Sequence, residues 1–315
     1  MILRILLVIL TLGVLPVYPQ AIVEDGKLTI TPNWEPNDTK TYIRDSYAFL
    51  KEDDEYKNEP DSSKMEIIMK VMNKTPDNYM VEAKRNFLDE NNEQGIQAKL
   101  FDAMNGTRFT YSMSSEGSFM EITNKDAILA LIRNTMIENW EMLDLKHPRT
   151  GNDIDNEVQA RNMLKMQFSR MGDRMWVQYQ MDVPYMIYHA FYNEKLNMEG
   201  ETIKRDTVKD REQNEHIMKN VYKVEDMDAI NNVATISLNA SYTEKTLGSY
   251  FAMPVYRQIQ STRRLKELPE TKVDISVNYK VDLATGWVKE YEYTIDSYVE
   301  DFHHKRNAKM VMQEK

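Results

Sequence analysis

The segment that decides the fold is residues 272–296, which read KVDISVNYKVDLATGWVKEYEYTID. From Val273 to Leu283 every second residue is apolar or aromatic, and the residues between them are polar or charged. This period of two predicts a long antiparallel strand with one buried face. Gly286 then stands where a tight hairpin loop needs a positive φ. We therefore predict a hairpin in which Gly286→Val costs about 1–2 kcal/mol.

Two other segments alternate in the same way. Residues 233–242 do so, and Met65–Val71 leads through a turn at Thr75–Asn78 into a return strand. Laying residues 64–79 over 272–287 needs no gap, which favours an ancient duplication of one hairpin; chance agreement between two polar hairpins is the alternative. The fold class we predict is α+β. It has a long, curved, antiparallel β-sheet, which is a duplicated half-barrel if the duplication is real, and a helical middle segment.

The middle of the chain has helical spacing. Apolar residues recur every three or four positions over residues 124–140, where Asn124 is the predicted N-cap, and again over residues 153–171. A third helix is predicted at residues 174–181, ending before Pro184. The domain organisation that follows is a signal peptide at 1–21, a β-rich N-terminal half at 22–123, a helical segment at 124–192 and a β-rich C-terminal half at 193–315.

The first residues have the pattern of an export signal. Arg4 is followed by an apolar run from Ile5 to Val17, which is shorter than the roughly twenty residues that a membrane span needs. We expect cleavage near Ala21, with an uncleaved anchor as the alternative, and no transmembrane segment after cleavage. Secreted eukaryotic domains usually carry disulfides, so the lack of Cys favours a bacterium. The predicted localisation is periplasmic or secreted, in the bacterial envelope.

Composition excludes several classes of function. The 315 residues contain no Cys, which rules out disulfides, thiolate zinc sites, iron–sulfur clusters and a cysteine nucleophile. A formal net charge of −10 gives no attraction for phosphate backbones, so we expect no nucleic acid partner. Nucleophile elbows, phosphate loops and metalloprotease helices are absent from the sequence. We therefore predict that the protein is not an enzyme and has no catalytic residues, no metal and no cofactor.

Three weaker signals also have plain structural interpretations. Residues 89–95 are faintly similar to a calcium loop, but Leu100 occupies the final ligand position, and a solvated acidic loop is favoured. His189 lies in an aromatic segment and is interpreted as a core or rim residue, not as a base. The sequence has 22 Met. The favoured explanation for this high content is that methionine fills gaps in the core. The alternatives are adaptable contacts around an apolar ligand and copper binding by thioethers.

Several of these features recur together in one known group of proteins. They are the export signal, the segment Asn33–Pro36, the Met-rich hairpin, the helical middle and the closing segment Val281–Trp287. In this layout the chain resembles uncharacterised secreted proteins of Bacteroidetes. The resemblance implies an envelope location, a duplicated curved sheet and no assigned activity. More distantly, a curved sheet with helices across its concave side is similar to the periplasmic lipoprotein carriers, by analogy of fold alone.

The apolar face of the predicted sheet needs a cover, because large exposed apolar patches are uncommon on soluble monomers. We expect the helices at 124–140 and 153–171 to cover part of it, and a pocket to form near Pro184. The candidate ligand-binding residues are Trp176, Tyr179, Met186, Phe191, Trp287 and Tyr291. The predicted function is an exported, non-enzymatic protein that binds a lipid-like or other apolar small molecule. The alternative is a structural or protein-interaction module of the envelope with a dry core, and no particular protein partner is indicated.

Overall fold

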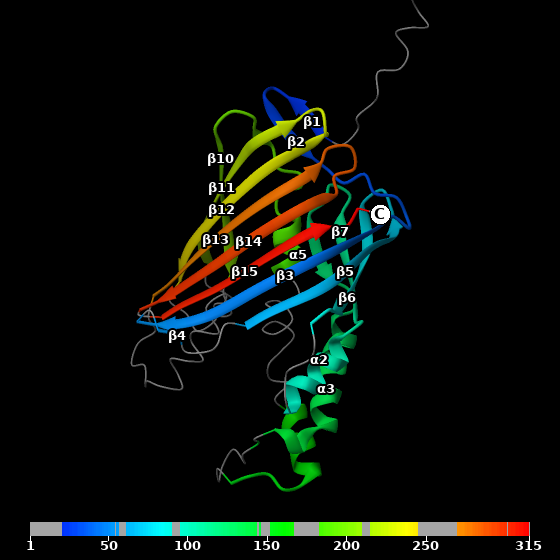
Figure 1. The fold of residues 1–315 in the computed structure, drawn as a ribbon, viewed down its shortest axis with the longest axis vertical. Helices are drawn as coiled ribbons and strands as arrows, with labels where there is room; N and C mark the ends of the chain where they lie inside the picture. The colour runs from blue at the N-terminus through cyan, green and yellow to red at the C-terminus, as the bar shows by residue number, and fades with distance from the viewer. Residues whose placement is uncertain are drawn as a thin grey trace, which may run out of the picture.

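The structure is a computed structural model, and it describes residues 21–53, 55–56, 61–89, 95–143, 145, 152–166, 183–209, 215–244, 270–300 and 302–314. Residues 1–20 of the predicted signal peptide lie outside this part of the chain, as does the predicted helix at 174–181. Antiparallel strands dominate the described residues, and a few helices accompany them (Figure 1). This agrees with the β-rich α+β class that the sequence predicts.

Most of the strands form one antiparallel sheet. Its members are β3 Thr39–Glu52, β4 Glu55–Tyr56, β5 Asp61–Lys74, β6 Asn78–Phe87, β7 Arg108–Ser114, β8 Phe119–Ile122, β10 Glu201–Lys209, β11 Glu215–Asp228, β12 Val233–Glu244, β13 Thr271–Asp282, β14 Val288–Val299 and β15 Phe302–Met312. The strand order is β10-β11-β12-β13-β14-β15-β3-β5-β6-β7-β8, and β4 pairs with β3 off this path. A small second sheet contains β1 Ala21–Glu24, β2 Lys27–Ile30 and β9 Leu196–Asn197, in the order β1-β2-β9.

The hairpin predicted at Gly286 is confirmed as β13 and β14. Alternate residues of β13 from Thr271 to Val281 are buried, and the residues between them are exposed or half-buried. Gly286 has a φ of +73°, as the predicted turn requires. Its backbone N–H donates to the carbonyl of Asp282 at 2.7 Å, which closes the loop. The turn chemistry of the sequence thus determines where the two strands separate.

The alternation predicted for β5, β6 and β12 is also confirmed. In β5, the buried apolar residues are Met65, Ile67, Met69 and Val71. The turn between β5 and β6 is closed by the backbone N–H of Thr75, which donates to the carbonyl of Asn78 at 2.8 Å. Alternation of side chains and local turn bonds therefore account for both predicted hairpins.

Helices occupy the middle of the chain. They are α2 Gly95–Met104, α3 Lys125–Glu138, the 3-10 helix η1 Trp140–Met142, a helical stretch at 157–166 and α5 Val183–His189. α3 begins after Asn124 as predicted, but the Asn124 side chain does not cap it. Instead, this side chain accepts from the backbone N–H of Thr110 at 2.9 Å and donates to the carbonyl of Arg108 at 2.8 Å, so it ties the helix to β7. In the described ranges, no helix is long and apolar enough to cross a membrane.

Among the described helices, α5 packs against the buried face of the sheet, a place that the sequence predicts for residues 124–140 and 153–171. α2 and α3 extend past the end of the sheet (Figure 1), and α3 joins the main core through Ile128 and Ile132. The described part of the second predicted helix packs in a separate small cluster around Met163. Pro184 lies in the first turn of α5, where a missing N–H is tolerated. Amphipathic spacing predicts that a helix has an apolar face, but it does not identify the surface that this face meets.

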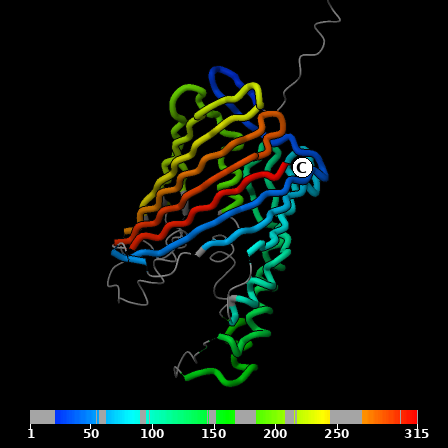
Figure 2. Tube along the Cα trace, in the orientation of Figure 1, coloured from blue at the N-terminus to red at the C-terminus, as the bar shows by residue number. Residues whose placement is uncertain are grey.

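The contacts of α5 show how strongly the sheet curves. The Tyr279 hydroxyl of β13 donates to the carbonyl of Ile187 at 2.6 Å, and the Tyr111 hydroxyl of β7 lies 3.2 Å from Nε2 of His189. β14, β15, β3, β5 and β6 separate β13 from β7, so a flat sheet would place these strands about 29 Å apart. A helix about 10–12 Å wide cannot span that distance. The sheet therefore wraps around α5 as a trough (Figure 2), and we call its concave side the inner face.

Aromatic side chains fill much of the inner face. Trp34 and Trp287 are buried and stack with their ring centroids 3.9 Å apart. Tyr79 and Tyr192 pack edge-on against Trp34, with centroids at 5.9 and 6.1 Å. Phe191 packs against Tyr279 of β13 at 4.8 Å. This packing leaves little free space beneath the segment that follows α5.

Candidate functional site

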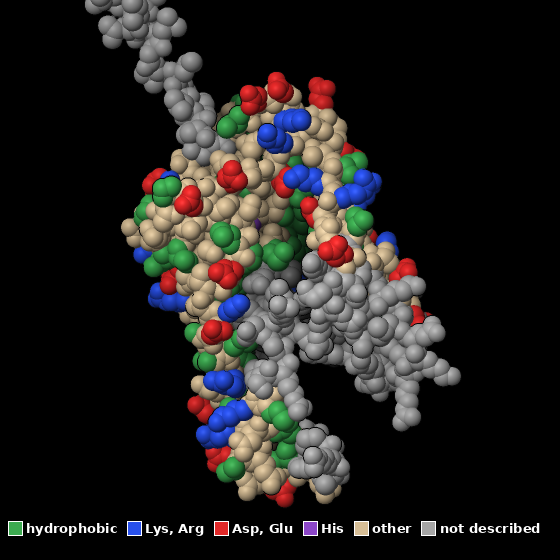
Figure 3. Space-filling view, turned by 180° about the vertical axis from the view of Figure 1, so that it is seen from behind, with side chains coloured by type: hydrophobic (Ala, Val, Ile, Leu, Met, Phe, Trp, Pro, Cys, Tyr) green, Lys and Arg blue, Asp and Glu red, His purple; other side chains and the backbone are tan. Residues whose placement is uncertain are grey.

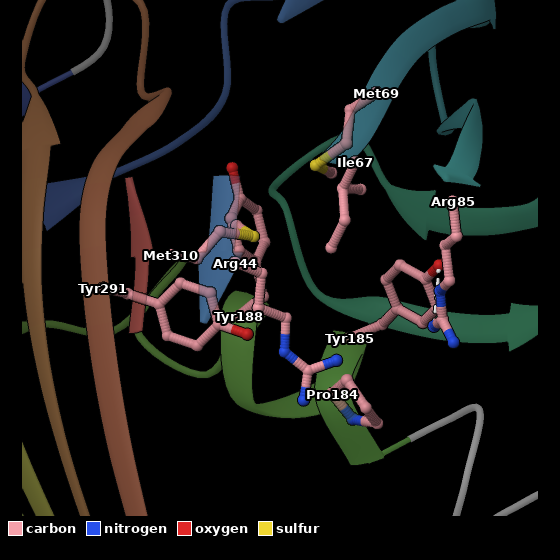
Figure 4. Close-up of a pocket in the computed structure, with 9 residues that line it drawn as sticks. All are labelled: Arg44, Ile67, Met69, Arg85, Pro184, Tyr185, Tyr188, Tyr291 and Met310. Atoms are coloured by element: carbon pink, nitrogen blue, oxygen red, sulfur yellow. Dashed lines mark hydrogen bonds between the residues drawn. The ribbon is translucent and has the colours of Figure 1, made fainter. Parts of the chain in front are cut away.

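A small hollow remains between α5 and the inner face of the sheet (Figure 4). Its lining comes from five strands and from α5: Arg44, Ile67, Met69, Arg85, Pro184, Tyr185, Tyr188, Tyr291 and Met310. Strand register explains why these residues meet. Arg44 of β3 pairs with Met310 of β15, and Met310 pairs with Tyr291 of β14. On the other side, Ile67 of β5 pairs with Arg85 of β6.

The hollow has an apolar end and a cationic end. Ile67 and Met69 lie at one end, and the guanidinium groups of Arg44 and Arg85 lie toward Pro184 at the other (Figure 4). The space that the centre of a water molecule can reach is about 20 Å³, which suits about one water. The hollow therefore admits the few atoms of a small polar group and has no room for a whole acyl chain.

Arg44 is an unusual residue for the inside of a sheet, because it is only 9% exposed. Its Nη2 donates to the hydroxyl of Tyr293 at 3.0 Å, and its Nη1 lies 3.9 Å from the sulfur of Met65. Its Nε is buried without a hydrogen-bond partner. Within the described part of the chain, no Asp or Glu pairs with this guanidinium. A buried charge that lacks a counter-charge is energetically costly.

Arg85 provides a second, half-buried cation. Its Nη2 donates to the hydroxyl of Tyr185 at 3.1 Å, and its guanidinium lies 4.0 Å from the ring centroid of Phe109. The Nε of Arg85 is buried without a hydrogen-bond partner. Among the residues that the structure describes, no carboxylate pairs with Arg85 either. Two guanidinium groups thus line one hollow in a protein whose formal net charge is −10.

Two tyrosines of the hollow, Tyr188 and Tyr291, stay protonated at neutral pH. Burial raises the pKa of Tyr188 and of Tyr291 above the ordinary tyrosine value. The Tyr188 hydroxyl lies 3.1 Å from that of Tyr42, whose pKa burial also raises. These groups can form hydrogen bonds, but they supply no phenolate that could act as a base or a nucleophile.

His189 lies in the core, as the sequence interpretation expected. It is 2% exposed, and its ring packs among those of Trp34, Tyr111 and Tyr192. Burial lowers the pKa of His189 to about 3, so the ring is neutral at physiological pH. An enclosed, neutral histidine of this kind is a packing residue.

We expect His189 to make the fold sensitive to acid. An unfolded chain protonates a His near pH 6.5, whereas the folded protein protonates His189 only near pH 3. Between these values the unfolded state binds more protons, so the free energy of unfolding falls by up to about 1.4 kcal/mol for each pH unit lost. Chemical denaturation at pH 7, 6 and 5 measures this slope.

His189→Gln should reduce that slope, because the neutral amide takes up no proton in either state. The remaining acid sensitivity should include a contribution from His304, whose pKa burial lowers to about 4. A slope that is unchanged in the variant would show that the pKa of His189 is the same in the folded and unfolded states.

The sequence-predicted ligand residues occupy different places. Tyr291 lines the hollow, while Phe191 and Trp287 are buried in the aromatic packing of the inner face. Met186 is 54% exposed and is not part of the lining. The remaining two predicted residues, Trp176 and Tyr179, lie outside the described residues.

Sequence reasoning missed the two arginines. A signal for Arg44 does exist, since it stands two residues after Tyr42 and two before Ser46, at the spacing of one strand face. A charged residue at such a position is informative only once the strand and its buried side are known. Arg85 stands two residues after Ala83 in a predicted return strand, so its inward position could have been assigned.

Metal ligands are a separate question. Among the described residues, no group of three or more His, Asp or Glu is arranged to hold a metal ion. Residues 90–94 of the calcium-like segment lie outside the described part. Met69 lines the hollow, whereas Met72 of the same strand is 46% exposed, so these two thioethers do not face one site.

Comparison with known proteins adds no assignment. A scan against protein-family models finds no family that matches this chain, and a search of curated proteins finds no related sequence. A function therefore has to be argued from the geometry and charge of the hollow.

Proposed function

We propose that the protein is an exported, non-enzymatic binding protein of the bacterial envelope that holds a lipid-like ligand at the inner face of its sheet. The observation that carries this proposal is the hollow beneath α5, where Ile67, Met69 and Met310 face free space beside hydrogen-bonding groups. Sites for small molecules typically combine an apolar wall with a few placed polar groups. Because the hollow is small, it would hold one end of the ligand, and the remainder would extend from the opening along the trough.

Export is supported by the sequence. Arg4 and the apolar run Ile5–Val17 have the length and charge of a signal peptide, and the lack of Cys suits an exported bacterial protein. We propose a periplasmic or secreted location on this basis. The resemblance of the sequence, in layout alone, to secreted proteins of Bacteroidetes leads to the same proposal.

We also propose that the sheet is a duplicated half-barrel. In the strand order, β12-β13-β14-β15 and β3-β5-β6-β7 are two adjacent meanders of equal size. The hairpins β13–β14 and β5–β6, which align without a gap in the sequence, occupy the same place in their meanders. In each hairpin the register shifts near the turn, but the extra residue is Lys289 of the second strand in one and Met72 of the first strand in the other. The equal places of the two hairpins in the strand order support a common origin.

The absence of catalytic function is proposed on chemical grounds. Among the described residues that line the hollow, the titratable side chains are arginines and tyrosines, and burial raises the pKa of Tyr188 and Tyr291. Neither kind of group is suited to accept a proton at neutral pH. Binding without chemistry is therefore the function that these residues support best.

A second candidate function is a structural or protein-interaction module with a dry core. The close aromatic packing around Trp34 and Trp287 favours it, because this part of the inner face is already filled by the chain's own side chains. A packed interior of this kind needs no ligand for stability. The two candidates differ in whether the hollow takes up an apolar molecule.

We expect an environment-sensitive apolar probe to bind the full-length exported protein at about one saturable site, and Met69→Phe to weaken this binding about tenfold or more. The reason is that Met69 is 2% exposed and lines the hollow, which the larger ring would fill. The matched control is Met72→Phe, the same substitution on the same strand at a position that is 46% exposed. Denaturation midpoints of both variants are needed, since overpacking costs about 1–3 kcal/mol.

An equal loss of binding in both variants would argue against the hollow as the site. Native mass spectrometry of the purified protein, followed by organic extraction, provides the second measurement. If only bare polypeptide is found and the folded protein shows no saturable probe binding, the interaction module becomes the better interpretation.

A further inference from the structure

We infer that the ligand of the hollow is an amphiphile with an anionic headgroup, a carboxylate or a phosphate, held by Arg44 and Arg85. This inference deepens the proposed function and rests on it. Its basis is that both guanidinium groups line the same hollow, while neither pairs with a carboxylate among the described residues. The positive charge of the site is therefore left without a counter-charge from the described chain.

The burial of Arg44 makes this unbalanced charge significant. Arg44 is 9% exposed, and a guanidinium does not lose its proton at physiological pH, so neutralisation cannot relieve the cost of burial. The chain contains 50 Asp and Glu residues, yet none of those in the described ranges is placed beside it. An anion that comes from outside the chain would supply the missing charge.

Both arginines have N–H groups that are not used in hydrogen bonds to the described chain. Of the five N–H donors of a guanidinium, Arg44 uses one on Tyr293 and directs another at the weakly accepting sulfur of Met65. Arg85 uses one on Tyr185. Both groups lie on the Pro184 side of Ile67 and Met69, with the ring of Tyr185 between them (Figure 4). A guanidinium fork matches the oxygens of a carboxylate or a phosphate, and these charge-assisted bonds are the strong ones.

The opposite end of the hollow indicates that the ligand is more than a free anion. Ile67 and Met69 present apolar surface there, from which an inorganic ion gains nothing. On the face seen in Figure 3, acidic and basic side chains of the described residues are interspersed, and they form no broad basic patch there. Anion recognition is therefore local to the two arginines.

The test is a competition against the bound apolar probe by compounds that share one hexadecyl-length chain. Palmitate and hexadecyl phosphate carry anionic heads, and monopalmitoylglycerol carries a neutral head. Inorganic phosphate supplies the anion without a chain. We expect the anionic amphiphiles to bind about tenfold or more tightly than the neutral one, and inorganic phosphate at millimolar concentration not to compete.

Substitutions then assign the effect to the arginines. Arg85→Gln and Arg44→Gln should each lower the affinity for palmitate or hexadecyl phosphate about tenfold, and should lower that for monopalmitoylglycerol by much less, because only neutral hydrogen bonds are lost there. Arg85→Lys, which keeps the charge but not the fork, should retain part of the affinity. The control is Arg108→Gln on the neighbouring strand β7, whose side chain is 62% exposed and which should alter neither affinity. If Arg44→Gln does not fold, the half-buried Arg85 decides the question.

These experiments distinguish the inferred anionic headgroup from the proposed binding of an apolar ligand. Equal affinity for anionic and neutral amphiphiles would overturn the inference while leaving the proposed function intact. If no chain-bearing compound displaces the probe, or none binds at all, the proposed function fails as well. If inorganic phosphate competes as well as hexadecyl phosphate, the site binds a free anion, and the inference that its ligand is an amphiphile is wrong.

Discussion

Gly286→Ala is expected to destabilise the protein by about 2–5 kcal/mol, a large effect for one added methyl group. Two causes contribute. At a φ of +73° an L-residue costs about 1–2 kcal/mol relative to glycine. In addition, a Cβ at this position would lie 2.7 Å from the carbonyl oxygen of Thr31 and 3.1 Å from Cα of Pro32. Both are backbone atoms that cannot rotate away, so the clash adds about 1–3 kcal/mol.

The matched control is Gly26→Ala in the loop between β1 and β2. Gly26 has a φ of +69°, and a Cβ there would meet nothing within 4 Å. This variant should therefore show the conformational cost alone, about 1–2 kcal/mol. Urea denaturation of both variants, followed by tryptophan fluorescence and far-ultraviolet circular dichroism, measures the difference. Equal midpoints would mean that the loop at Gly286 does not press against Thr31 in solution.

The same position shows what turn chemistry can and cannot predict. The sequence Ala284–Gly286 between two alternating strands predicts a positive φ, which the structure confirms. The expected cost of 1–2 kcal/mol for Gly286→Val covered only that local strain. The close approach of the segment at Thr31 was not predictable. It depends on tertiary bonds, such as the backbone N–H of Asn33 donating to Thr285 at 3.0 Å and the Tyr192 hydroxyl donating to the carbonyl of Gly286 at 2.6 Å.

Strands were predictable where one face is uniformly apolar. β13 and β5 satisfy this condition, and the sequence places both. β3 and β15 lie at the centre of the sheet but were missed, because their inward positions mix apolar and polar types. Arg44 interrupts the apolar face in β3, and His304 does so in β15, although both are buried. Arg44, one of the two charged residues of the hollow, therefore interrupts the period-two pattern by which its own strand could have been predicted.

The helix of the site was missed for a different reason. Pro184 was interpreted as the end of a preceding helix, whereas it lies in the first turn of α5. Proline is compatible with both places, since only the interior of a helix needs its missing N–H. The longer amphipathic segments were predicted as helices, and α3 confirms one of them, but spacing alone could not show that α5 would take the central place on the inner face.

Replacing Arg44 by Met together with Tyr293 by Phe is expected to stabilise the protein in the absence of ligand, by about 1–4 kcal/mol. Arg44 is buried, and within the described chain its charge is not balanced by a carboxylate, so an apolar side chain of similar length avoids that cost. Tyr293 is changed as well because its hydroxyl accepts from Arg44 at 3.0 Å. Arg44→Met alone would leave this buried hydroxyl without its partner, at about 1–3 kcal/mol, so its gain should be smaller or absent.

The stabilised double variant should at the same time lose its preference for anionic over neutral amphiphiles. A substitution that raises the free energy of unfolding and abolishes selective binding indicates that the original residue serves binding and destabilises the fold. Arg108→Met is the control, because its side chain is 62% exposed and its pairing with Glu82 at 2.8 Å should contribute no more than about 1 kcal/mol. If the double variant instead unfolds at a lower denaturant concentration than the parent, the hydrogen bond from Arg44 of β3 to Tyr293 of β14 stabilises the fold. The charge in the hollow would then need no ligand to explain it.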